Sequence, residues 1–275
     1  MDVDNLRDQL GRIAIIGGGH MGEAILAGLV HGAFFDPEAV IVANPGEQRR
    51  RELSENYGVD CVADGAKINN PDTVILAIKP ARLREVSHQL SAAWEIAPKR
   101  VVSIAAGIPS SVIQDLFPNS VVIRVMPNVA LAVGAGMTEV AMTADTPIKE
   151  AELVCELFSM MGEAVIVDEG LIDIATSVSG SGPAYFALFA EELAKAAAQA
   201  GLDAQLASLL ARQTLIGAAR YLELNDANAE ELRKVVTSPN GTTQAALESF
   251  FADDLGSILS NAVQACIHRA KELAC

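Results

Sequence analysis

The stretch from Arg12 to Ile25 constrains the fold more than any other part of the chain. It opens with a short apolar run, Ile13–Ile16, which is typical of a buried strand. Gly17, Gly19 and Gly22 follow in the G-x-G-x-x-G spacing, and helix-forming residues come next. In a dinucleotide site the first glycine allows a tight turn, the second lets backbone approach a pyrophosphate, and the third lets helix and strand pack closely. The order of strand, glycine turn and helix therefore predicts dinucleotide binding.

Composition and charge narrow the classes of function. The chain has 275 residues, enough for one large or two moderate domains. Hydrophobic residues make up 51% and aromatic residues only 4%, so the core must be mainly aliphatic. A net charge of −15 argues against nucleic acid as a partner, because phosphate binding needs clustered Lys and Arg. No apolar run reaches the roughly 18 residues of a membrane span, so no membrane partner is expected.

The N-terminal residues and the cysteines predict a cytoplasmic protein. Residues 1–5 are acidic and lack the basic and apolar regions of a signal peptide. The four cysteines have neither metal-like nor redox spacing, which predicts reduced thiols and no metal site. They are Cys61, Cys155, Cys266 and Cys275.

Apolar runs separated by helical segments dominate the first part of the chain and predict an α/β fold with a parallel sheet covered on both faces. The expected strands are 13–16, 39–43, 59–62, 73–78, 101–106, 121–126 and 165–167. Residues 1–11 are expected to be an irregular polar lead-in. From residue 169 onward the pattern is helical, over 184–200, 204–224, 229–236, 243–251 and 255–273. We therefore predict a first domain over residues 1–168 and an all-helical domain over 169–275.

The end of the second expected strand bears on the choice of cofactor. An acidic residue there would hydrogen-bond the ribose 2′-OH of NAD and repel the 2′-phosphate of NADP. Asn44 holds this position, and Arg49, Arg50 and Arg51 follow in the next helix. These arginines either favour a phosphate or form a solvated helix face. The position favours NADPH and leaves NADH possible.

Two further segments lie at predicted strand ends, where an open α/β sheet collects its ligands. In the segment 76–80, Lys79 lies either beside the cofactor or free in solvent. In the segment 103–107, small residues that include Ala106 either let a ring approach the backbone or simply pack tightly.

Two more segments are loops that run into predicted helices. The loop 177–185 combines serine, glycine and a helix-starting proline, which favours an anion-binding or close-approach element over a flexible turn. In the loop 236–243, the N–H groups of Gly241, Thr242 and Thr243 are candidates to bind a carboxylate. The alternative there is a plain helix cap by Thr242.

Six motifs in order resemble pyrroline-5-carboxylate reductases, and the resemblance runs from about residue 13 to residue 270. The motifs are Gly-Gly-Gly-His-Met-Gly-Glu-Ala-Ile at 17–25, Leu-Ala-Ile-Lys-Pro at 76–80, Ser-Ile-Ala-Ala-Gly-Ile at 103–108, Arg-Val-Met-Pro-Asn at 124–128, Ser-Gly-Ser-Gly-Pro-Ala-Tyr at 179–185 and the loop 238–243. The resemblance implies reduction of Δ1-pyrroline-5-carboxylate to L-proline with hydride from NAD(P)H. It also implies a Rossmann domain followed by a helical dimerisation domain, with dimers that can assemble into rings such as a homodecamer.

The resemblance also implies roles for single residues. The glycine turn with His20 and Met21, together with Asn44, Asp64, Lys79 and Ala106, matches cofactor positions. Positions near the substrate match Glu169, Ser238, Gly241, Thr242 and Thr243. The chain departs from the family pattern at Val129-Ala130, Ala135, Asn240 and Asp64. Of these departures only Asp64 bears on the cofactor, because its charge near the adenosine would weaken NADPH.

The mechanism that we expect needs little acid–base chemistry, because a protonated imine is already electrophilic. Thr243 is expected to hydrogen-bond the ring nitrogen, orienting it or relaying a proton. One rival is a β-hydroxyacid dehydrogenase, whose catalytic lysine has its nearest match in Lys195, out of register for that motif. A second rival is a non-catalytic NAD(P)-sensing scaffold.

Overall fold

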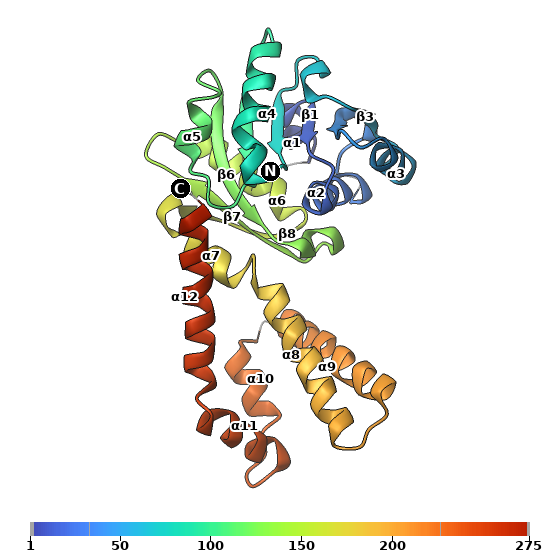
Figure 1. Ribbon diagram of the computed structural model, residues 1–275, viewed down its shortest axis with the longest axis vertical. Coiled ribbons are helices and arrows are strands. Elements are labelled where there is room, and N and C mark those ends of the chain that lie inside the picture. Colours follow the sequence, from blue (N-terminus) through green and yellow to red (C-terminus); the bar gives the residue numbers. More distant parts are fainter. Residues whose placement is uncertain (1–2, 33, 226, 274–275) are drawn as a thin grey trace. The chain divides into compact units, whose positions relative to one another are not determined.

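The computed structural model describes residues 3–32, 34–225 and 227–273 (Figure 1). These residues divide into two compact units, one formed by residues up to 181 with 266–273, the other by 182–265. These units are defined by compactness and do not test the predicted domain boundary after residue 168, which stays a prediction.

One sheet organises the first unit. Within the described residues its strand order is β3-β2-β1-β4-β5-β6-β7-β8. The strands are β1 (Ile13–Ile16), β2 (Val40–Ala43), β3 (Asp60–Val62), β4 (Thr73–Leu76), β5 (Arg100–Ser103), β6 (Val121–Pro127), β7 (Gly136–Met142) and β8 (Gly162–Asp168). All pairings are parallel except that between β6 and β7. The first six positions have the 3-2-1-4-5-6 order of a Rossmann sheet, which confirms the predicted α/β class.

Helices cover both faces of the sheet over β1 to β6, where the side chains of the strands alternate between two cores. Ile13 and Ile15 pack with residues of α1, α2 and α6, whereas Ala14 and Ile16 pack with residues of α4 and α5. Helices of this unit are α1 (Val3–Leu10), α2 (His20–His31), α3 (Glu47–Tyr57), α4 (Pro80–Ala93), α5 (Ser110–Gln114), α6 (Ile148–Ser159) and α7 (Ile172–Val178). Short 3-10 turns are η1 (Pro37–Ala39), η2 (Gly65–Lys67), η3 (Val129–Val133) and η4 (Glu169–Leu171).

Two predictions for this unit were wrong. Residues 3–10 are not irregular but form α1, because Leu6 and Leu10 lie one turn apart and are buried in the core. The sequence pattern also missed β7, an antiparallel partner of β6. Its buried Glu139 interrupts the apolar run that would have indicated a strand.

The second unit is helical in its described residues. It contains α8 (Gly182–Gln199), α9 (Ala204–Asn225), α10 (Ala229–Val235), α11 (Thr242–Ala252) and the first part of α12 (Leu255–Leu273). Side chains cap two of these helices. Asp203 accepts from the N–H groups of Gln205 and Leu206 at the start of α9. Asn228 and Glu231 form a capping box at the start of α10.

Candidate functional site

Four of the predicted cofactor positions lie at one edge of the sheet. Strands β1, β2, β4 and β5 are parallel neighbours, so the residues that follow them come together at their carboxyl ends. Gly17, Asn44, Lys79 and Ala106 occupy this edge. The chain order reverses between β1 and β4, which is where doubly wound sheets bind dinucleotides.

The glycine turn has the shape that a pyrophosphate requires. Gly17 has φ +112°, and a Cβ there would lie 2.2 Å from the carbonyl oxygen of Ala77. At Gly22 a Cβ would lie 1.9 Å from the carbonyl oxygen of Gly17. At Gly19, the N-cap of α2, an added Cβ would have no atom of the described residues within 4 Å apart from its own chain neighbours. Two of the glycines thus serve packing, and the middle one leaves room for a ligand, so the turn fits a dinucleotide.

The first turn of α2 adds N–H groups to this cradle. His20 begins the helix and is exposed, whereas Met21 packs partly against the core. The N–H groups of the first turn lack carbonyl partners within the helix and carry its positive dipole end. The backbone N–H groups of His20 and Met21 are therefore what this turn offers to an anion, and their role in cofactor binding stays a prediction.

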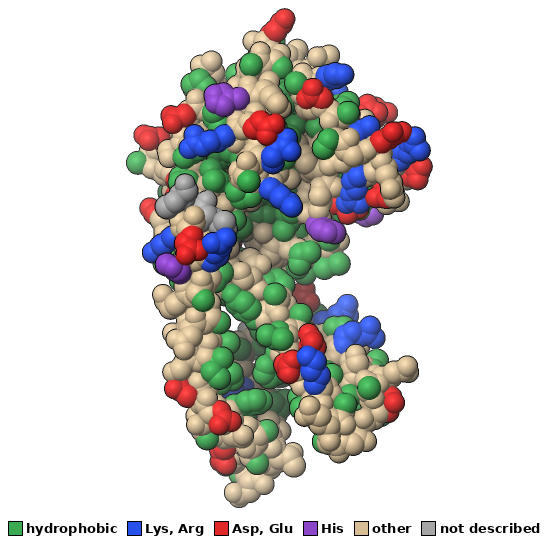
Figure 2. Space-filling model, in the orientation of Figure 1, with side chains coloured by type: hydrophobic (Ala, Val, Ile, Leu, Met, Phe, Trp, Pro, Cys, Tyr) green, Lys and Arg blue, Asp and Glu red, His purple; other side chains and the backbone are tan. Residues whose placement is uncertain are grey.

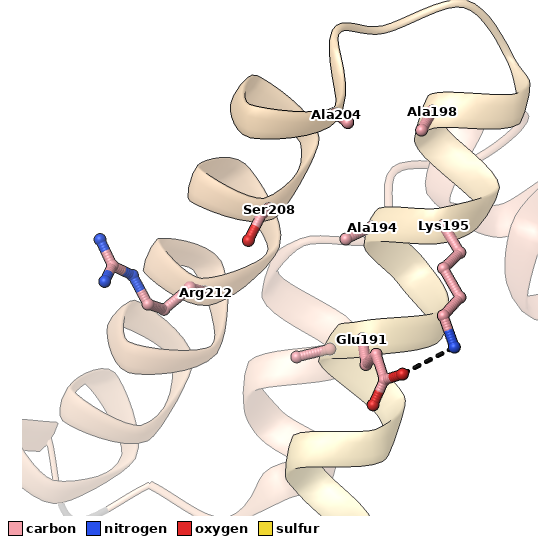
Figure 3. Close-up of a pocket in the computed structure, with 8 residues that line it drawn as sticks. Glu191, Ala194, Lys195, Ala198, Ala204, Ser208 and Arg212 are labelled. Carbon is pink, nitrogen blue, oxygen red and sulfur yellow. Dashed lines mark ion pairs between the residues drawn. The ribbon is translucent and has the colours of Figure 1, made fainter.

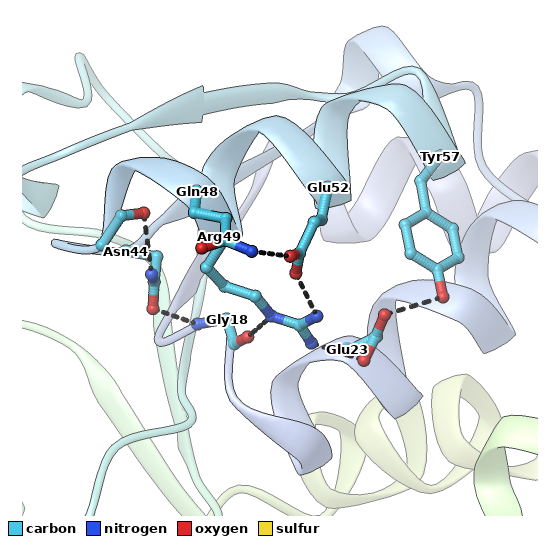
Figure 4. Close-up of polar contacts among 8 residues, drawn as sticks. Gly18, Glu23, Asn44, Gln48, Arg49, Glu52 and Tyr57 are labelled. Carbon is cyan, nitrogen blue, oxygen red and sulfur yellow. Dashed lines mark hydrogen bonds and ion pairs between the residues drawn. The ribbon is translucent and has the colours of Figure 1, made fainter.

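A polar network surrounds Gly18, which lies in the middle of the turn (Figure 4). Its N–H donates to Asn44 Oδ1 at 3.3 Å, and its carbonyl accepts from Arg49 Nε at 2.8 Å. Arg49 also pairs with Glu23 and, at 3.2 Å, with Glu52. The hydrogen bond to Glu23 raises the pKa of Arg49 further above its usual value.

The three arginines of α3 therefore differ from one another. Arg49 turns inward, while Arg51 is exposed and pairs with Glu47 along the helix. Arg50 donates to the carbonyls of Asn44 and Pro45, at 2.8 and 2.7 Å, at the end of β2. The two alternatives considered for these arginines were a phosphate site and a solvated helix face. Neither holds for all three, because Arg49 and Arg50 contact the chain and Arg51 lies in solvent.

Lys79, Ala106 and Asp64 have contrasting environments. Lys79 is the exposed N-cap residue of α4 and forms no ion pair with any described residue. Ala106 is half-buried and packs against a small apolar cluster that includes Met126. Asp64 is exposed and accepts the N–H of Ala66 at 3.0 Å, so it caps the turn after β3.

The structure does not bring Glu169 to this edge. It follows β8, which is parallel to β7 and therefore runs opposite to β1–β6, so Glu169 lies at the other edge. Its carboxylate accepts from the N–H and the hydroxyl of Ser110, at 2.7 and 2.9 Å. In this structure Glu169 anchors the start of α5.

The predicted substrate loop lies in the helical unit, at the start of α11. Gly241 is the N-cap, and its N–H donates to the carbonyl of Ser238 at 3.0 Å. The Gly241 N–H is therefore already hydrogen-bonded. The backbone N–H groups at this helix start that remain available to a ligand are those of Thr242 and Thr243. Among the described residues neither threonine hydroxyl has a hydrogen-bond partner. The loop thus presents both N–H groups and hydroxyls.

Lys195 lies in a groove of about 340 Å³ formed by α8 and α9 (Figure 3). Its ammonium pairs with Glu191 at 2.6 Å and with Glu192 at 2.7 Å, which raises its pKa. An exposed lysine held by two carboxylates of its own helix is a poor general acid. This geometry disfavours a β-hydroxyacid dehydrogenase.

Comparisons with known proteins identify the family. A protein of Synechocystis sp. named pyrroline-5-carboxylate reductase is 38% identical over 263 residues, covering 95% of this chain and 98% of that protein. This chain belongs to the pyrroline-5-carboxylate reductase family. The pyrroline-5-carboxylate reductase of Pseudomonas aeruginosa is 36% identical, covering 96% of this chain and 97% of that protein. The structure of a pyrroline-5-carboxylate reductase from Coxiella burnetii superposes with a TM-score of 0.88 at 32% identity, covering 97% and 99%.

Two family models match separate parts of this chain. The model described as pyrroline-5-carboxylate reductase dimerisation matches residues 169–273. The model described as NADP oxidoreductase coenzyme F420-dependent matches residues 12–107. The chain is thus an oxidoreductase with a nucleotide-binding part and a dimerisation part, in the predicted order.

Two further properties concern the described residues alone. No helix among them has both the length and the apolar character needed to cross a bilayer. They also contain no group of three or more His, Cys, Asp or Glu side chains arranged to hold a metal ion.

The sequence pattern did not identify Glu23 and Tyr57 as part of this polar network, in which the Tyr57 hydroxyl donates to Glu23 at 3.3 Å. It also left open whether the Arg49 side chain points toward the glycine turn or into solvent. A signal was present, because helices that follow adjacent parallel strands begin side by side. An acid in the first turn of one helix and an arginine in the first turn of the other are therefore expected to meet.

Proposed function

We propose that this chain reduces Δ1-pyrroline-5-carboxylate to L-proline, the last step of proline biosynthesis, as an NADP-dependent oxidoreductase. The identity to the Synechocystis reductase over nearly the whole of both chains carries the proposal. The open space at Gly19, beside a turn that tolerates no side chain at Gly17 or Gly22, supports it from the structure.

When bound, NADPH supplies the hydride. The first turn of α2 would hold its pyrophosphate, and Lys79 and Ala106 would lie along the same edge of the sheet. Asn44 and Arg50 lie at the end of β2, where the adenosine ribose binds in sheets of this order. A cation and an amide there favour the 2′-phosphate, whereas an acid would repel it. Asp64 follows β3, the strand next to β2 in the sheet. Its negative charge would lower the preference for NADPH and leaves NADH as a second cofactor.

The loop of Ser238 to Thr243 would bind the substrate. The N–H groups of Thr242 and Thr243 would hold the carboxylate of the imine at the positive end of α11. The free hydroxyl of Thr243 would hydrogen-bond the ring nitrogen. Because the protonated imine is already electrophilic, orientation and exclusion of water account for most of the catalysis. For Glu169 a substrate contact rests on the family resemblance, since its carboxylate is engaged by Ser110.

The helical unit accounts for association with a second copy. Large apolar side chains are exposed on its helices, as Figure 2 shows. Phe186 and Phe251 are 64% and 63% exposed. Surfaces of this kind mark interfaces, and the dimerisation model covers both residues. We propose a homodimer in the cytoplasm that can assemble further into a ring such as a homodecamer.

One assay tests the activity. The purified protein is mixed with Δ1-pyrroline-5-carboxylate and NADPH, with NADH in a parallel reaction, and loss of the reduced cofactor is followed together with formation of proline. We expect proline in proportion to the cofactor oxidised, with NADPH the better donor. A protein that binds NADPH but forms no proline is a nucleotide-binding scaffold, and the proposed function is then wrong.

A further inference from the structure

The peptide of Gly18 is held on both sides by groups that do not belong to its own turn. Asn44 accepts from its N–H, and Arg49 donates to its carbonyl. Both contacts come from the segment after β2, so that segment sets the orientation of the turn after β1. Gly18 itself is buried, and a Cβ there would lie 2.6 Å from a methyl carbon of Leu53. The turn therefore keeps one conformation only while these neighbours stay in place.

Arg49 also bridges the turn to an acid in the first turn of α2. Its guanidinium contacts both the carbonyl of Gly18 and the carboxylate of Glu23, and the two side chains are 29% and 26% exposed. Figure 4 shows Arg49 lying between Gly18, Glu23 and Glu52. The hydroxyl of Tyr57 completes the contacts of Glu23.

The position of Glu23 creates an electrostatic problem for an anionic ligand. An acid in the first turn of a helix stabilises the helix itself, because it faces the positive dipole end. The same end of α2 is where a pyrophosphate would bind. Without a cation beside it, the carboxylate of Glu23 would repel that group. Arg49 supplies the cation, and its inward direction makes it a poor ligand for a phosphate at the outer end of β2.

We propose that Arg49 is a positioning residue for the cofactor, which neutralises Glu23 and orients Gly18 so that the glycine turn accepts the pyrophosphate of either NADPH or NADH. This inference rests on the proposed function for the identity of the cofactor. It differs from the alternative in which Arg49 itself binds the 2′-phosphate, a role that the proposed function gives to Arg50 and Asn44. The pyrophosphate is common to both cofactors, so loss of Arg49 must weaken both equally.

Direct binding to the purified protein tests this inference without turnover. The fluorescence of NADPH and of NADH is titrated with wild type and with Arg49→Gln. We expect both dissociation constants to rise by a similar factor, roughly tenfold, as one uncompensated charge beside an anion predicts. The ratio of the two constants stays at its wild-type value. A loss confined to NADPH would mean that Arg49 binds the 2′-phosphate, and the inference would be wrong.

A second pair of variants separates charge from folding. Glu23→Gln alone should bind both cofactors at least as tightly as wild type, and Arg49→Gln with Glu23→Gln should recover most of the lost affinity. If Glu23→Gln weakens binding as much as Arg49→Gln does, the pair is merely structural and the inference is overturned. Arg49→Lys keeps the charge should the glutamine variant fold poorly, and we expect it to retain most of the affinity for both cofactors.

Arg51→Gln provides the matched control. It removes the same charge from the same helix, at a side chain that is 72% exposed and whose partner among the described residues is Glu47 of the same helix. We expect unchanged affinity for both cofactors. Wild type that binds neither cofactor would contradict the proposed function itself, which is a different result from any change in the variants.

Discussion

The side-chain amide of Asn128 donates to the carbonyl of Ser179 at 3.1 Å. Asn128 directly follows β6 and Ser179 directly follows α7, so one side chain joins the ends of two of the family motifs. Its Oδ1 also accepts the N–H groups of Ala130 at 3.1 Å and of Met137 at 3.3 Å. Since Asn128 is only 7% exposed, these contacts are nearly shielded from water.

Asn128→Ala should therefore destabilise the fold. The substitution removes the side-chain partner of two backbone N–H groups and one carbonyl, all half-buried, and an unpaired buried group of this kind costs up to about 1–3 kcal/mol. In a chain of this size we expect the Tm to fall by roughly 5 °C or more. Thermal unfolding measures this, with Asn69→Ala at the surface as control. Equal Tm values for the two variants would show that the contacts of Asn128 contribute nothing.

The parallel strands and the glycine turn were predictable because they depend on short-range patterns. A continuous apolar run such as residues 74–78 indicates a strand buried on both faces, whatever it pairs with. Spacing alone placed Gly17, Gly19 and Gly22, and the structure gives them the geometry that this spacing implies. The start of α10 was predictable for the same reason, because the capping box that fixes it spans only four residues, from Asn228 to Glu231.

What could not be predicted depends on partners far apart in the chain. The strand β7 contains Glu139 and pairs antiparallel with β6, so neither its polarity nor its direction matches the pattern of the other strands. Arg49 is an intermediate case: its partner Glu23 lies 26 residues away, and only the order of the adjacent strands and helices indicates that the two meet. Glu169 and Ser110 lie 59 residues apart, and only the reversal at β7 brings them together.

Glu139 should make stability depend on pH. It is 3% exposed, and burial raises the pKa of its carboxyl above the ordinary 4.5, although the Ser179 hydroxyl opposes the rise. A raised pKa in the folded state means that the stabilisation is present below the ordinary pKa and is lost as pH rises through the folded value. We expect Glu139→Gln to raise the Tm relative to wild type by an amount that grows as the pH rises above the ordinary 4.5 and through the raised pKa of the folded state.

Thermal unfolding of both proteins across this pH range measures the effect. Glu163→Gln, an exposed carboxylate on β8, is the control and should follow wild type at every pH. A constant difference between Glu139→Gln and wild type would contradict the assignment of the pH dependence to this carboxyl.

Two glycine variants should distinguish a glycine that leaves room for the cofactor from one that is needed for packing. The methyl group of Gly19→Ala meets no described atom beyond its chain neighbours within 4 Å, so we expect an unchanged Tm. We expect the affinity for NADPH to fall roughly tenfold or more, since the methyl group would occupy the proposed place of the pyrophosphate. Gly22→Ala places a Cβ 1.9 Å from the carbonyl oxygen of Gly17, so its Tm should fall. Thermal unfolding and NADPH titration distinguish the two. Normal NADPH binding by a folded Gly19→Ala protein would place the cofactor elsewhere.

Association should depend on the exposed aromatic residues of the helical unit. Phe186→Glu puts a charge on a side chain that is 64% exposed in the single chain and that we expect a second copy to cover. Light scattering after size exclusion should show a dimer or larger assembly for wild type and a shift toward monomer for the variant. Ile96→Glu, at a residue of the first unit that is 60% exposed, should leave the mass unchanged. The same mass for all three proteins would exclude Phe186 from the interface.

Thr243→Ala should impair reduction of the imine without affecting the cofactor. Thr243 is half-buried in the first turn of α11, and no described residue hydrogen-bonds its hydroxyl, so this group is free for a ligand. Loss of one such bond costs about 1–3 kcal/mol, or roughly 5- to 150-fold in kcat/KM. Steady-state kinetics at saturating NADPH measure the change, and the KM for NADPH should stay constant.

Two matched variants test whether the hydroxyl itself is responsible. Thr243→Ser keeps it and should recover most of the activity, whereas Thr237→Ala removes a nearby hydroxyl that already donates to the carbonyl of Arg233 and should behave as wild type. The backbone N–H groups of the α11 start survive in every variant, so carboxylate binding is retained and the loss isolates the contact to the ring nitrogen. If Thr243→Ala retains full kcat/KM for the imine, the hydroxyl neither orients the ring nitrogen nor passes it a proton.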